Sequence, residues 1–152
     1  MKLAEALQER ADLNRRIEQL RSRLDSNALV QEGEKPAEEP EKLLQELDGC
    51  VARLEELMAK INRTNCETMV EGKSLTEMIA RKDALLIRLS AYRDLVNTAS
   101  QTARRATRSE IKIFSTINVQ DKQRMVDEMA KELRLLDNKL QATNWTVDLK
   151  ED

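Results

Sequence analysis

The stretch LLQELDGCVARLEELMAKI, residues 43–61, decides the fold class. Its main apolar residues, which alternate steps of three and four along the chain, are Leu44, Leu47, Val51, Leu54, Met58 and Ile61. This spacing is typical of helices that pack side by side at shallow angles. Leu43, Cys50 and Leu57 widen the apolar stripe, so we expect this helix to contact more than one neighbour.

Three further segments of the chain repeat this spacing. They run through Leu13, Ile17, Leu20 and Leu24, through Met78, Leu85, Leu89, Tyr92, Val96, Ala99 and Ala103, and through Val126, Met129, Leu133, Leu136 and Leu140. The four segments predict helices over about residues 2–27, 41–64, 75–104 and 119–143, with connections 28–40, 65–74 and 105–118 and a tail 144–152. Asn118 is the expected N-cap of the last helix. We therefore predict one all-α domain over residues 1–152, an elongated antiparallel four-helix bundle with coiled-coil-like packing.

Composition and charge narrow the function classes. Charged residues make up 36% of the 152 residues and aromatic residues 2%, as expected for long helices with an aliphatic core. The net charge of −2 gives no overall attraction to nucleic acid or acidic lipid. The longest uncharged run, residues 95–103, is far shorter than the roughly 20 residues that cross a bilayer. A charged amphipathic pattern follows Met1 directly, so we predict no secretory signal and a cytoplasmic location.

Two connections carry residues that favour strands. Ile111, Ile113 and Ile117 alternate with polar residues, and Leu29 and Val30 interrupt the first connection. In an up-down bundle these connections lie at the same end. We therefore predict a small two-stranded β element between residues 28–31 and 111–114. This pairing could form within one chain or between subunits, because two isolated strands are marginally stable.

Polar residues gather near the ends of the second and fourth predicted helices. They are Asn62, Arg63, Asn65, Asn144, Trp145 and Asp148. One interpretation is helix capping with a tail held in place by Trp145. The alternative is a small anion or partner site that uses Arg63 and the start of the third helix.

A basic patch ends the third predicted helix. It consists of Arg104, Arg105 and Arg108. Cations at a helix C-terminus complement the helix dipole, which explains the patch without a ligand. Contact with phosphate or nucleic acid is the alternative, although aromatic residues for base stacking are absent from this segment.

No residue pattern indicates catalysis, a cofactor or a metal ion. The chain contains no histidine, which excludes Ser-His-Asp and Cys-His catalysis and the Glu-x-x-His di-iron site. Cys50 and Cys66 match no metal or redox spacing. No glycine-rich phosphate loop is present. We predict no catalytic, cofactor-binding or metal-binding residues.

Several strings together resemble a known family. They are LNRRIEQLRSRL (13–24), NALVQEGEKPAEEP (27–40), INRTN (61–65), YRDLV (92–96), RSEIK (108–112) and NWTVDL (144–149). They look like the small bacterial proteins of the septicolysin family. The resemblance implies an all-helical, oligomeric bacterial protein, and the family name suggests a cytolysin. It supplies no catalytic residues.

These observations leave three function classes. A non-enzymatic homo-oligomer with a structural or interaction role is favoured, because nearly every feature serves helix association. A membrane-active or pore-forming protein is the alternative, supported by the family name alone. An enzyme is the third class. The expected partner is a second copy of the chain, and nucleic acid is not an expected partner.

Overall fold

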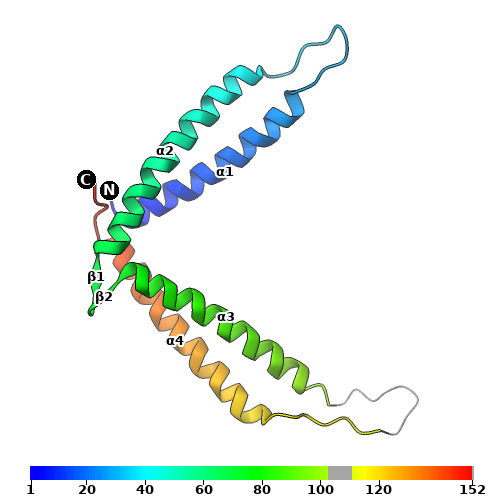
Figure 1. Cartoon of the computed structure of the whole chain (residues 1–152), viewed down its shortest axis with the longest axis vertical. Helices are drawn as coiled ribbons and strands as arrows, with labels where there is room; N and C mark the ends of the chain where they lie inside the picture. The colour runs from blue at the N-terminus through cyan, green and yellow to red at the C-terminus, as the bar shows by residue number, and fades with distance from the viewer. Residues whose placement is uncertain (103–110, 152) are drawn as a thin grey trace. The chain divides into compact units, whose positions relative to one another are not determined.

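The computed structural model describes residues 1–102 and 111–151. In this part of the chain the elements are α1 (Leu3–Asn27), α2 (Pro40–Glu67), β1 (Met69–Val70), β2 (Lys73–Ser74), α3 (Leu75–Ala99) and α4 (Val119–Thr146) (Figure 1). The predicted all-α class with a small two-stranded β element is confirmed. The chain divides into two compact units, the first formed by Met1–Ser74 with Thr143–Asp152 and the second by Leu75–Ala142.

In the first unit, α1 and α2 pack side by side and run in opposite directions (Figure 1). Leu20 of α1 and Leu57 of α2 are fully buried, and Leu43 is nearly so. The line of Leu44, Val51 and Met58, which we call the outer row, stays 38%, 45% and 44% exposed. The sequence pattern placed the outer row in the main stripe of this helix. In the structure, the stripe through Leu43 and Leu57 is the buried one.

The second unit is built by α3 and α4, which also lie side by side (Figure 1). Its core cluster consists of Leu85, Leu89, Val96, Val126 and Met129, with Tyr92 and Leu133 packed against it. The N-cap predicted for α4 is confirmed, because the Asn118 side chain accepts a hydrogen bond of 3.0 Å from the Asp121 amide. Both units therefore pair two antiparallel helices, the packing expected of members of a bundle.

The β element lies elsewhere than predicted. β1 and β2 pair antiparallel, with Met69 opposite Ser74 and Val70 opposite Lys73. Glu71 and Gly72 between them have φ angles of 52° and 83°, as a two-residue hairpin turn requires. A hairpin this short has no periodic pattern, so it left no signal in the sequence.

The predicted pairing of residues 28–31 with 111–114 does not form within the chain, since neither segment is a strand there. Leu29 is 90% exposed, and a turn follows it in which the Glu34 amide donates to the Gln31 carbonyl. Phe114 is 76% exposed. Alternating β-branched residues favour extended backbone, but they form a strand only when another backbone segment accepts their hydrogen bonds.

Candidate interaction surfaces

The two ends of the described chain are joined by backbone hydrogen bonds in the first unit. The Leu3 amide donates to the Val147 carbonyl, and the Leu149 amide donates to the Met1 carbonyl, both at 2.9 Å. Lys2 and Asp148 lie opposite each other as an antiparallel bridge, and their side chains form an ion pair of 2.8 Å. The hydrogen bond from Lys2 lowers the pKa of the Asp148 carboxyl. We call residues 1–3 with 146–151 the terminal junction (Figure 1).

Side chains at the end of α2 hold the terminal junction. Thr64 is fully buried, and its hydroxyl accepts a hydrogen bond of 3.0 Å from the Lys150 amide. The same hydroxyl donates to the Lys60 carbonyl one turn earlier in α2. Two ion pairs flank this contact, Lys60 with Glu151 at 2.5 Å and Lys150 with Glu67. The hydrogen bonds of these pairs lower the pKa of the Glu151 and Glu67 carboxyls.

The predicted polar residues lie around this junction, but few of them make its contacts. Asp148 does, through Lys2. Asn62 and Arg63 are exposed on α2, Asn65 and Asn144 are half-buried, and Trp145 is 52% exposed.

An anion site at Arg63 gains no support from its surroundings. The charge of Arg63 contributes, after Lys150, to lowering the pKa of the nearby Glu67 carboxyl. A carboxylate therefore already neutralises part of this positive field, which weakens attraction to a free anion.

Apart from Asp148, the sequence pattern missed the residues that make the junction. Thr64 continues the buried stripe of α2, since it follows Leu57 by seven residues, and this spacing was the one available signal. Lys150 and Glu151 lie in a segment without periodicity, so no pattern pointed to them. The contacts of Lys150 and Glu151 with α2 form only because the end of α4 brings the tail next to α2.

The basic patch of Arg104, Arg105 and Arg108 lies outside the described residues. Cys50 is a half-buried thiol on α2, and the thiol of Cys66 near the end of α2 is exposed. Among residues 1–102 and 111–151, no three His, Cys, Asp or Glu side chains are grouped as metal ligands would be.

One flank of the α1–α2 pair carries three ion pairs whose α1 members are spaced seven residues apart. The pairs are Glu9 with Arg53, Arg16 with Glu46, and Arg23 with Glu38. The Arg53 guanidinium donates to both carboxylate oxygens of Glu9, at 2.6 and 3.0 Å. These hydrogen bonds lower the pKa of Glu9, and the Arg23 guanidinium lowers that of Glu38 in the same way. The two pairs between α1 and α2 match the antiparallel direction, because the α2 partner moves from Arg53 to Glu46 as the α1 partner moves from Glu9 to Arg16. Glu38 lies in the connection just before α2.

The opposite flank of α2 carries the outer row. The outer row of Leu44, Val51 and Met58 occupies one heptad position. Around the helix, the buried stripe lies between this row and the ion-pairing residues Glu46 and Arg53. The residues of the outer row are partly exposed, as noted above, so the first unit leaves them incompletely covered. Their alignment along the helix makes them a candidate surface for a partner helix.

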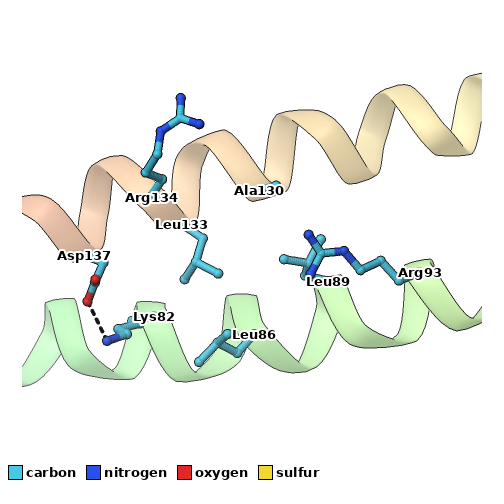
Figure 2. Close-up of a pocket in the computed structure, with 8 residues that line it drawn as sticks. All are labelled: Lys82, Leu86, Leu89, Arg93, Ala130, Leu133, Arg134 and Asp137. Atoms are coloured by element: carbon cyan, nitrogen blue, oxygen red, sulfur yellow. Dashed lines mark hydrogen bonds and ion pairs between the residues drawn. The ribbon is translucent and has the colours of Figure 1, made fainter.

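The second unit has an open groove between α3 and α4. It has a volume of about 250 Å³. Its lining residues, drawn in Figure 2, are Lys82, Leu86, Leu89, Arg93, Ala130, Leu133, Arg134 and Asp137. Leu86 is 44% exposed, whereas Leu89 and Leu133 belong to the core of the unit. The apolar surface of the core therefore reaches solvent along this groove.

Charged side chains surround the apolar part of the groove. Lys82 and Asp137 form an ion pair of 2.7 Å between α3 and α4, and the hydrogen bond from Lys82 lowers the pKa of Asp137 (Figure 2). Arg93 and Arg134 are exposed, and neither forms an ion pair with another residue that the structure describes. The groove thus combines leucine side chains with two uncompensated positive charges.

Residues 10–149 match the family of unknown function DUF6847. The chain belongs to this family. A crystal structure of a functionally unknown conserved protein from Corynebacterium diphtheriae is similar to this DUF6847 member over 99% of each chain, with a TM-score of 0.94 and 39% sequence identity. No curated protein matches the chain.

The resemblance to septicolysin is therefore wrong. The match that spans most of this DUF6847 chain is to a family of unknown function, and the similar solved structure carries no cytolysin description either. The quoted strings follow the helix pattern and the ends of the helices, which unrelated helical proteins can share. The membrane-active alternative rested on that family name alone, so it loses its support. In the described part of the chain, no helix has both the length and the apolar composition that a membrane span needs.

Proposed function

We propose that the protein is a non-enzymatic helical protein with a structural or interaction role, which acts as an oligomer of identical subunits. The outer row of α2 is the observation that carries this proposal. Leu44, Val51 and Met58 form a line of large apolar side chains on the flank that the ion pairs to α1 leave open. A line of this spacing is the surface through which one helix binds another.

The size of this surface indicates how association would work. Full burial of a Val, Leu or Met side chain gives roughly 1.5–3 kcal/mol, so each half-exposed member gains about 1 kcal/mol when covered. Two copies contribute six such side chains, about 6 kcal/mol in total. Association costs roughly 4–15 kcal/mol in lost freedom of motion. The outer row alone therefore supports weak association, and a stable oligomer needs a second surface.

The experiment is a mass measurement by light scattering on wild type and the Val51→Glu variant. We expect the wild type to have a multiple of the 17.5 kDa subunit mass and Val51→Glu to have the subunit mass. A carboxylate at position 51 would lose its hydration in the interface, next to the carboxylates that Asp48 and Glu55 already place there. Leu135→Glu is the matched control, because Leu135 is an exposed leucine, 54% accessible, on α4.

Each outcome has a definite meaning for this proposal. A wild type with the subunit mass at every concentration contradicts self-association. An oligomeric wild type that Val51→Glu leaves intact shows that another surface makes the contact. Circular dichroism on each variant shows whether the helices are retained.

A further inference from the structure

On α2, the charged residues next to the outer row on its solvent side all carry a negative charge. Glu41, Asp48 and Glu55 occupy the neighbouring heptad position, on the solvent side of the outer row, and we call them the acidic row. All three are exposed, and none forms an ion pair with another described residue. Asp48 precedes Val51 by about one helical turn, and Glu55 follows it by about one turn. The two carboxylates are therefore about 10 Å apart along the helix, at 1.5 Å per residue. Val51 is therefore an apolar side chain between two unpaired carboxylates.

The groove of the second unit has the complementary arrangement. Figure 2 shows Arg134 and Arg93 on opposite sides of Leu86 along the groove. The Arg93 guanidinium lies between the two helices beside Leu89, whereas the Arg134 side chain extends from α4 on the side away from α3 (Figure 2). Arg93 thus lies over the apolar groove, and Arg134 lies at its outer edge. The groove has a volume of about 250 Å³, which is below the roughly 300–1,000 Å³ of pockets that enclose a small molecule. An open groove of this size suits a few side chains of a partner helix.

We propose that α2 of one copy docks in the α3–α4 groove of a second copy. Val51 covers Leu86 and the core leucines below it, and the acidic row meets Arg93 and Arg134. The inference rests on the self-association proposed above and names the two surfaces that make it. Every copy carries both surfaces, so the contact forms twice and neither surface stays free when a two-fold axis relates the two copies. Opposite charges at the rim select this pairing over contacts between two grooves or two acidic rows.

The test uses two charge-reversed proteins. The first, Asp48→Lys with Glu55→Lys, makes the α2 surface basic, and the second, Arg93→Glu with Arg134→Glu, makes the groove acidic. In each protein alone, both contacts of the dimer place like charges together. We expect the dissociation constant of each homodimer to rise about tenfold or more. In a mixture, each contact of the mixed dimer again pairs opposite charges, so affinity returns to the wild-type range.

Sedimentation equilibrium of each protein and of the equimolar mixture measures these constants. The controls are Glu128→Lys and Lys131→Glu, exposed charges of α4 outside the groove, which should dimerise like wild type. A groove variant that dimerises like wild type, while Val51→Glu does not, overturns this pairing and leaves self-association intact. Two weakened homodimers that the mixture fails to restore also overturn it. A monomeric wild type overturns both proposals.

Discussion

The hydroxyl of Thr64 accepts a hydrogen bond of 3.0 Å from the main-chain amide of Lys150, 86 positions later in the sequence. Thr64 lies in the last turns of α2 and is fully buried. A buried hydroxyl that both donates to its own helix and accepts from another segment fixes the position of that segment. This contact ties the terminal junction to the helix pair of the first unit.

Replacing Thr64 by valine keeps the shape of the side chain and removes the hydroxyl. We expect a loss of about 1–3 kcal/mol in the free energy of unfolding, because the Lys150 amide loses its partner in a half-buried position. Thr64→Ser retains the hydroxyl and should keep most of the stability. Urea unfolding followed by circular dichroism measures both variants, and equal midpoints for valine and wild type would show that water replaces the hydroxyl.

Two leucines of the second unit provide a matched pair for the core. Leu89 is 2% exposed in the core cluster, and Leu135 is 54% exposed on α4. We expect Leu89→Ala to cost about 2–5 kcal/mol because it leaves a cavity, and Leu135→Ala to change stability by about 0.5 kcal/mol or less. Thermal unfolding compares the two, and similar costs for both would contradict the described core.

Two glycines should respond in opposite directions to the same substitution. Gly49 lies inside α2 with open space around its position, so alanine there should stabilise the protein by about 0.5–1 kcal/mol. Gly72 has a φ angle of 83° in the β1–β2 turn, where alanine should cost about 1–2 kcal/mol. Chemical unfolding of both variants measures the difference. A stabilising Gly72→Ala would mean that the turn has another conformation.

The ion pairs of the first unit predict how stability depends on pH. Their arginine partners lower the pKa of Glu9 and Glu38 from an ordinary value of 4.5. The unfolded chain therefore binds protons first as the pH falls, and the stability that these pairs contribute is complete above pH 4.5 and is lost below it. The free energy of unfolding, measured as the pH falls through this range, should decrease less for Glu9→Gln than for wild type. High salt should also reduce the loss, because the pairs are largely exposed.

The helices were predictable because their signal is long and periodic. α1 and α2 begin and end within three residues of the predicted bounds, and α4 ends three residues later than predicted. The buried side of α2 was not predictable from apolar residues alone, because two overlapping stripes share Leu47, Leu54 and Ile61. In the structure, Glu46 and Arg53 pair with α1, and the stripe through Leu43 and Leu57 on the same side of α2 is the buried one.

The candidate surfaces were less predictable than the helices, for a physical reason. The groove forms from side chains that α3 and α4 bring together, and residues such as Lys82 and Asp137 are 55 positions apart. The terminal junction depends on backbone hydrogen bonds, which any residue except proline can donate, so residue types carry no record of them. The short β1–β2 hairpin has two residues per strand, too few to show an alternating pattern.

The division of the chain also has a consequence for the order of folding during synthesis. The first unit is discontinuous, since its segments Met1–Ser74 and Thr143–Asp152 are separated by the whole of the second unit. A ribosome adds roughly 5–20 residues per second, so α1 and α2 leave it several seconds before Val147 and Leu149 are made. During that interval the backbone groups of residues 1 and 3 and the Thr64 hydroxyl have no partners from the tail. A nascent chain halted before residue 143 should therefore present the end of α2 to chaperones, and this exposure ends when residues 147–150 leave the ribosome and bind.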